Sequence, residues 1–193
     1  MTKELSKEEV IKQLEQHPSR LDKEKIIFDA MEKGFNDFFD GLRMALDPLV
    51  TFGVKRVAEK EDETSKNFKW KDFKELTNKL IKRDLTGHAA RDAILVSMEA
   101  STKQEWNGFY RRILIKDLRC GVSEKTVNKV AKNFPKYAIP IFSCPLAHDS
   151  ANHEKKMIGK KQIEIKLDGV RVLTIIRKNK VEMFSRNGKQ FHN

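Results

Sequence analysis

The sequence predicts an α+β protein with two parts, an all-α part followed by a shorter part that begins a β-sheet. Four apolar side chains at i, i+3, i+4 and i+7 form one helical face: Phe35, Phe38, Phe39 and Leu42. Near the carboxyl end the period changes to two, because Ile163, Ile165 and Leu167 alternate with polar residues. We therefore predict a helical domain over residues 1–133, followed by a linker and strands over residues 134–193.

The charge of the chain favours an anionic partner. Its 193 residues include 39 Lys and Arg against 28 Asp and Glu, a net charge of +11. Residues 134–193 hold 12 basic against 5 acidic side chains, and residues 1–133 hold 27 against 23. No apolar run approaches the ~20 residues of a membrane span, so nucleic acid is expected and a membrane is not. Two cysteines give no disulfide framework and the start lacks a signal peptide, which favours the cytoplasm.

Local signals predict six or seven helices in the first part. Ser6 with Glu9 forms a capping box that opens a helix to about Gln16, and Ser19 caps the next helix, which Gly34 interrupts. Further signals are a stop at Asp47-Pro48, an exposed charged loop at residues 55–67, a cap at Thr86 and a capping box at Ser101 and Gln104. Short connections between these helices are typical of a compact all-α domain.

A basic corner closes the helical part. The sequence predicts that a helix ends with Gly121 after its cap, and that Ser123 caps a further helix to about Asn133. The free amides of that helix, with Lys116 and Arg119 nearby, could hold a DNA phosphate without reading sequence. The alternative is an ordinary helical corner with solvated basic residues.

A lysine marks the start of the predicted sheet. Lys166 lies near the end of the first predicted strand, and Asp168-Gly169 forms a tight turn into a second strand, Val170 to Ile176. A third strand is predicted from Val181. On these residues alone, Lys166 could equally be a charged side chain on the wet face of a hairpin.

Two motifs in this region carry a resemblance to a known family. K-x-D-G-x-R begins at Lys166 and S-R-N-G-K begins nineteen residues later at Ser185. Together they resemble the opening of the adenylation domain of ATP-dependent DNA ligases, which belong to the covalent nucleotidyltransferases. The resemblance implies that residues 134–193 begin an adenylation domain of the nucleotidyltransferase (ATP-grasp-like) fold, incomplete in this chain.

A third motif points to the same family. Residues 115–123, I-K-D-L-R-C-G-V-S, precede K-x-D-G-x-R by about fifty residues. They resemble the helical DNA-binding domain that precedes the adenylation domain in viral, archaeal and eukaryotic ATP-dependent DNA ligases. RNA ligases and capping enzymes do not carry this domain, and its shortness here is most similar to ligases of tailed phages. The chain is identified on these motifs as part of an ATP-dependent DNA ligase.

The resemblance implies a covalent mechanism. Lys166 takes AMP from ATP, passes it to the 5′-phosphate at a nick, and the 3′-hydroxyl then displaces AMP. An ordinary lysine pKa of ~10.4 would keep the amine protonated, so burial or nearby positive charge must favour the neutral form. The family match puts Glu164 near the adenine, with Arg171 and Arg186 on the ribose or phosphates. Arginine suits this because its planar, always charged group pairs with oxyanions.

The expected partners follow from the same resemblance. They are ATP, Mg²⁺ and nicked double-stranded DNA, and the protein is expected to be a monomer. The DNA contacts are expected from Lys116, Arg119 and Ser123. The expected processes are DNA replication, repair and recombination. The expected compartment is the cytoplasm, or the host cytoplasm for a phage-encoded enzyme. We expect the metal ligands beyond Asn193, and this chain alone to be nearly inactive. No metal site is predicted within the chain, since Cys144, His148 and His153 match no zinc spacing.

Two alternatives stay open at this stage. In one, the chain is only a nucleic-acid-binding module and its K-x-D-G is a vestige or a chance hairpin. In the other, the parent is an RNA ligase or a capping-type nucleotidyltransferase, against which the motif at Lys116 to Gly121 argues.

Overall fold

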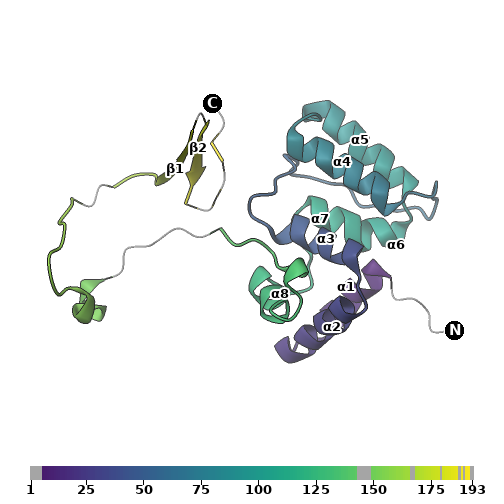
Figure 1. Ribbon diagram of the computed structural model, residues 1–193. Coiled ribbons are helices and arrows are strands. Elements are labelled where there is room, and N and C mark those ends of the chain that lie inside the picture. The colour runs from purple at the N-terminus through teal and green to yellow at the C-terminus, as the bar shows by residue number, and fades with distance from the viewer. Residues whose placement is uncertain are drawn as a thin grey trace. The chain divides into compact units, whose positions relative to one another are not determined.

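The computed structural model describes residues 6–142, 149–165, 168–178, 180–186, 188 and 190–191. The chain divides into two compact units, Met1–Ile141 and Phe142–Asn193, which are described separately. The elements of the first unit, shown in Figure 1, are α1 (Lys7–Gln16), α2 (Arg20–Glu32), α3 (Asn36–Leu46), α4 (Trp70–Lys82), α5 (Gly87–Ala100), α6 (Lys103–Glu105), η1 (Trp106–Tyr110), α7 (Arg111–Leu114), α8 (Glu124–Val130) and η2 (Pro135–Tyr137). Those of the second are η3 (Ser150–Asn152), η4 (Glu154–Lys156), β1 (Val172–Arg177) and β2 (Lys180–Ser185).

The helical unit encloses an aromatic core. Three of the four residues of the predicted face are buried, Phe38 and Leu42 at 0% exposure and Phe39 at 4%, and Phe35 is partly buried, so this aromatic stripe is core and not a platform for bases. Phe38 stacks on Phe109 with 6.0 Å between ring centroids. Figure 1 shows α6 and α7 running one after the other, and the π-helical turn η1 between them contributes Phe109 and two further core aromatics, Trp106 and Tyr110. Burial of such large rings supplies much of the unit's stability.

The predicted capping residues at the helix starts are confirmed in part. The Ser6 hydroxyl accepts from the Glu9 amide at 3.3 Å, and the Glu9 carboxylate accepts from the Ser6 amide at 2.8 Å, which confirms the first capping box. Ser19 does precede α2, but its side chain makes no capping hydrogen bond. The second capping box is wrong by one residue, because Thr102 and Glu105 form it.

The charged stretch 55–67 differs from the predicted exposed loop. Two of its side chains are buried, Val57 at 6% exposure and Lys60 at 2%. Its backbone is fixed by side chains of the 103–114 helical stretch, since Trp106 Nε1 donates to the Ala58 oxygen at 2.9 Å and Asn107 Nδ2 donates to the Lys60 oxygen at 2.8 Å. This stretch can be partly buried although it is rich in charge, because polar side chains from a distant part of the chain form hydrogen bonds with its backbone.

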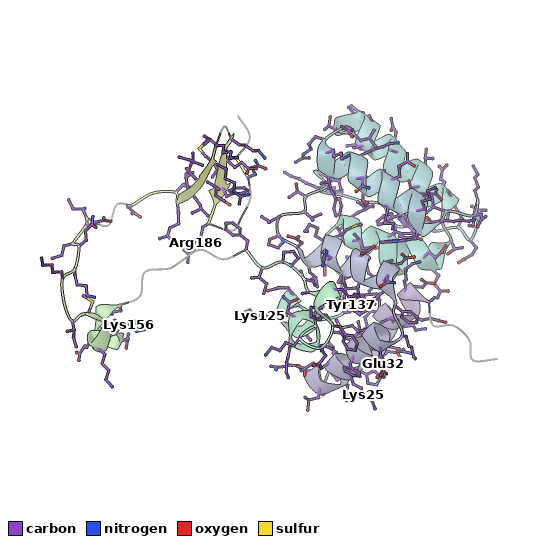
Figure 2. All side chains as sticks on the ribbon, viewed as in Figure 1. Lys25, Glu32, Lys125, Tyr137, Lys156 and Arg186 are labelled. Atoms are coloured by element: carbon purple, nitrogen blue, oxygen red, sulfur yellow. The ribbon has the colours of Figure 1, made fainter. Side chains whose placement is uncertain are left out.

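The segment predicted as a linker from residue 134 packs on the helices as far as Ile139. Asn128 brackets Ile139, accepting from its amide at 2.7 Å and donating to its oxygen at 2.9 Å. Arg43 donates to the Ala138 oxygen at 2.7 Å. Tyr137, 6% exposed and marked in Figure 2, donates to Asn36 Oδ1 at 2.9 Å. The helical unit therefore extends about eight residues past its predicted boundary.

Among its described residues, the second unit contains one antiparallel hairpin, β1 with β2. The expected second and third strands are confirmed with shifted bounds. The strand expected at residues 162–167 is wrong over 162–165, which form no strand with any described residue. Ile163 is 95% exposed and Ile165 87%, so alternation there meets no apolar surface among the described residues. A strand needs a partner as well as a pattern. No helix in the described ranges combines the length and apolarity needed to cross a membrane.

Candidate functional site

The basic corner of the helical unit begins with a left-handed helix end. The Lys116 amide donates to the Ile113 oxygen and the Asp117 amide to the Arg112 oxygen, both at 3.0 Å, which is the hydrogen-bond pattern of a Schellman motif. Lys116 occupies the left-handed position with φ 56°. The prediction that Gly121 ends this helix is therefore wrong, since the helix stops at Leu114.

The side chain of Lys116 turns toward α3. Its Nζ donates to the main-chain oxygens of Met44 at 2.9 Å and Asp47 at 2.7 Å, two carbonyls at the C-terminal end of α3. A cation there complements the helix dipole. Burial lowers the pKa of Lys116 to about 8, and the nearby Asp47 carboxylate opposes that shift. Lys116 thus holds the corner onto α3, and its predicted contact with DNA remains a prediction.

The loop after Lys116 alternates anchored and exposed residues. Leu118 is 4% exposed and Cys120 2%. Their carbonyl oxygens accept hydrogen bonds from Arg112 Nη1 at 2.9 Å and Lys23 Nζ at 2.8 Å. Between them Arg119 is exposed in a left-handed conformation, φ 53°, and its amide donates to Asp117 Oδ1 at 3.0 Å. The loop presents a guanidinium to solvent on a fixed backbone.

Ser123 has the predicted capping role at the start of α8. Its Oγ accepts from the Thr126 amide at 3.4 Å. A Lys129–Glu24 ion pair of 2.6 Å ties α8 to α2. Two exposed lysines of this helix pair, Lys25 on α2 and Lys125 on α8, are marked in Figure 2. Neither lysine is predicted from the sequence as a contact for an anion, because no pattern along the chain indicates that α2 packs against α8.

In the second unit, the strand register relates two predicted nucleotide contacts. Val172 at the start of β1 pairs with Ser185 at the end of β2. Arg171 precedes the first of these residues and Arg186 follows the second, so both arginines lie at the same end of the hairpin, where Figure 2 marks Arg186. Both side chains are exposed. Two guanidinium groups at one hairpin end make it a candidate anion site.

After Arg186, backbone hydrogen bonds of the described residues lead back to β2. The Gly188 amide donates to the Ser185 oxygen at 2.9 Å, and Gly188 has φ 79°, a conformation that glycine adopts without a side-chain clash. The Phe191 amide then donates to the Met183 oxygen at 2.8 Å. A backbone hydrogen bond thus joins Ser185 and Gly188 of the motif, on either side of Arg186.

The other predicted site residues are separated or undescribed. Glu164 lies in the exposed unpaired segment, where its Oε1 accepts from Gln162 Nε2 at 2.6 Å. Lys166, the predicted nucleophile, lies outside the described residues, as do Cys144 and His148 of the rejected zinc set. Over the part of the chain that the structure describes, no group of three or more His, Cys, Asp or Glu side chains could hold a metal ion.

Comparisons with known proteins identify similar solved structures. No family model matches the chain, and no curated protein matches it. Two solved structures match with 82% sequence identity over 98% of this chain: Pmar-Lig_PreS3, with a TM-score of 0.82, and Pmar-Lig_Pre, with a TM-score of 0.83. The chain spans 44% of the length of each. This chain is therefore similar, over nearly all its residues, to less than half of two longer proteins whose names contain "Lig".

Proposed function

We propose that this chain is part of an ATP-dependent DNA ligase, in which it supplies a DNA-binding helical unit and the segment that carries the nucleophilic lysine. The observation that carries the proposal is the 82% identity to solved structures named Pmar-Lig, in which we interpret "Lig" as ligase. At such identity two chains share a fold and most of their side chains. The resemblance of the motifs at Lys116, Lys166 and Ser185 supports DNA as the substrate and ATP as the nucleotide donor.

The helical unit would bind the sugar-phosphate backbone of duplex DNA. Arg119 supports this assignment, because it is exposed on a loop whose neighbours are buried and hydrogen-bonded. Lys25 and Lys125 add exposed positive charge on the adjoining helix pair. Contacts of this kind position an enzyme on DNA without reading base sequence, as an enzyme that seals nicks in any sequence requires.

The chemistry proposed for the second unit starts from a neutral Lys166 amine. The amine attacks the α-phosphorus of ATP and forms a P–N bond. The bond between the α-phosphorus and the oxygen that bridges to the β-phosphorus breaks, so pyrophosphate leaves, and the nitrogen loses a proton. AMP then passes to the 5′-phosphate at the nick, which frees the lysine. Attack by the 3′-hydroxyl on the activated 5′-phosphate closes the nick and expels AMP.

Arg171 and Arg186 would hold the anionic parts of ATP during this transfer. Their common place at one hairpin end supports the role, since two guanidinium groups can pair with phosphate oxygens through several N–H donors. Their positive charge would also favour the neutral form of a nearby lysine. Glu164 would contact the adenine. Mg²⁺ is expected with ATP, although no group of three or more His, Cys, Asp or Glu side chains among the described residues could hold it.

The test uses residues 1–193 joined to the part of Pmar-Lig_Pre that the similarity leaves uncovered. Incubation with Mg²⁺ and ATP radiolabelled at the α-phosphate should give a labelled protein that survives denaturation. The label should be released by acid or hydroxylamine and resist mild base, as a P–N bond does. Lys166→Arg keeps the positive charge but lacks a neutral amine, so it should abolish labelling and leave duplex binding nearly unchanged.

Matched variants separate the alternatives. Lys160→Arg and Lys161→Arg are the controls and should at most slow labelling. Full labelling of Lys166→Arg would disprove the assignment of the nucleophile. Duplex binding without any labelling would favour the non-catalytic module, and sealing of nicked RNA without sealing of nicked DNA would favour an RNA ligase.

A further inference from the structure

A groove of about 690 Å³ lies between the extended segment 54–58 and helix α5. Its lining includes Val54, Lys55, Arg56, Arg91, Ile94 and Leu95. None of them belongs to the basic corner or to the second unit. The function proposed above gives this groove no role.

The groove has an apolar lining. Val57 and Ile94 belong to the buried core, at 6% and 5% exposure. Leu95 is 37% exposed, and Val54 is partly buried against the same core. A hollow of this volume, lined by aliphatic side chains, is of a size and character that can take the anchor side chains of a bound peptide.

Three exposed cations, Lys55, Arg56 and Arg91, also line the groove. Within the described part of the chain, none of the three forms an ion pair or a side-chain hydrogen bond. Three of the four acids that follow in the same charged stretch pair with other cations: Glu59 with Arg111 at 3.1 Å, Asp62 with Lys60 at 2.9 Å and Glu63 with Lys103 at 3.5 Å. The groove therefore keeps an excess of positive charge that internal contacts leave uncompensated.

One wall of the groove is preformed. Arg111 Nε donates to the Val57 oxygen and Trp106 Nε1 to the Ala58 oxygen, both at 2.9 Å. Trp106 is itself fully buried. A wall held in this way needs little ordering when a ligand binds, which favours affinity.

We propose that this groove docks a helical peptide segment of another protein, in which apolar anchor residues at helical spacing are interspersed with Asp and Glu. The anchors would contact Val54, Ile94 and Leu95, and the acidic side chains would pair with Lys55, Arg56 and Arg91. Duplex DNA fits the same cations but not the apolar lining, because protein–DNA interfaces are polar and wet. Charge and lining together favour the acidic amphipathic peptide.

The test uses the 193-residue chain and a fluorescent synthetic peptide of about 14 residues, with Leu at helical spacing and Glu between. Binding is followed by fluorescence anisotropy, and the site is mapped by NMR chemical shifts of the labelled chain. The peptide should shift the amide resonances of segment 54–58 and of α5 around Arg91. Arg91→Glu should weaken binding by at least about tenfold, because it sets like charges against each other. Leu95→Ser should weaken it by removing an apolar contact.

Matched controls make the outcome decisive. Lys12→Glu, the same charge reversal on the exposed face of α1, should leave peptide binding unchanged. A peptide with Lys in place of Glu, or with Ala in place of Leu, should bind at least about tenfold more weakly. Equal binding of the Glu and Lys peptides would overturn the proposal. A second result would also overturn the proposal. In it, the Glu peptide shifts no groove resonance, whereas duplex DNA shifts these resonances and binds the Arg91→Glu variant more weakly than the unmodified chain. No arm uses ATP or ligation, so failure here is distinct from failure of the proposed function.

Discussion

The Lys116 ammonium lies 2.7 Å from the main-chain oxygen of Asp47, which joins the left-handed end of α7 to the C-terminal end of α3. Asp47 is itself buried at 7% exposure, and its Oδ1 accepts from the Leu49 amide at 2.8 Å. A lysine at a position that usually favours glycine is thus held by long-range hydrogen bonds. This contact fixes the loop that presents Arg119.

Lys116 should titrate at lower pH than an ordinary lysine. Burial lowers its pKa from 10.5 to about 8, so ¹³Cε chemical shifts of labelled lysines should show one midpoint near 8. Between these two pKa values the unfolded chain binds more protons at this site than the folded chain. The contribution of Lys116 to stability should therefore be constant below about pH 8 and rise with pH toward 10.5. A midpoint near 10.5 would contradict the burial of this amine.

Removing the Lys116 ammonium should destabilise the helical unit. Lys116→Met leaves the Met44 and Asp47 carbonyls without their donor, which should cost about 1–3 kcal/mol in the free energy of unfolding measured with urea. Lys116→Gly should destabilise the unit less than Lys116→Met. A side chain in the left-handed conformation has a steric cost of roughly 1 kcal/mol, which glycine does not have. Lys12→Met, on the exposed face of α1, is the control and should change stability by less than about 0.5 kcal/mol.

The roles of Lys116 and Arg119 in DNA binding should separate in the salt dependence. If Arg119 contacts a phosphate, Arg119→Ala should weaken binding to all duplex sequences alike and reduce the slope of log affinity against log salt by about 1. Lys116→Met should weaken binding while leaving the slope unchanged, because its ammonium is used within the protein. An equal loss of slope in both variants would mean that Lys116 also reaches DNA. Salt-independent binding, or none, by the unmodified chain would rule out the interface.

The two serines that precede helices provide a matched pair for capping. Ser6→Ala removes a side-chain cap on α1 and should cost about 1 kcal/mol. Ser19→Ala, at the start of α2, removes a hydroxyl that makes no capping hydrogen bond and should cost clearly less. Urea unfolding of the two variants checks the difference. Equal losses would show that capping is not the cause.

Gly41 should not tolerate a methyl group. A Cβ at Gly41 would lie 2.5 Å from Phe109 Cζ and 2.8 Å from Ile113 Cδ1, inside the core. Overpacking of this kind costs about 1–3 kcal/mol, which exceeds the gain of up to about 1 kcal/mol from alanine's helix propensity. Gly108→Ala is the comparison, since its nearest contact is Glu8 Cβ at 3.0 Å, and should cost less. A thermal shift of Gly41→Ala to higher temperature would contradict the close packing of α3 on α7.

The sequence by itself determined the helical character of the first unit, several of its boundaries and its aromatic core. The Ser6–Glu9 box, the break at Gly34 and the buried face of α3 depend on residues within a turn or two of each other, so local reasoning finds them. The motifs at residues 115–123 and 166–171 are equally local. They bring a family resemblance with them, but not the geometry of the sites.

Only the tertiary structure decided which charged groups face solvent and which serve the fold. Lys60 and Lys116 resemble surface lysines in sequence, yet each bonds to carbonyl oxygens more than thirty residues away. Ile163 and Ile165 have the alternation of a strand but no strand partner in the described chain, whereas strand register brings Arg171 and Arg186 to one hairpin end. The physical reason is the same in each case. A hydrogen bond, a strand pair or a buried charge depends on a second group that the chain supplies from elsewhere, and the pattern around one residue does not specify it.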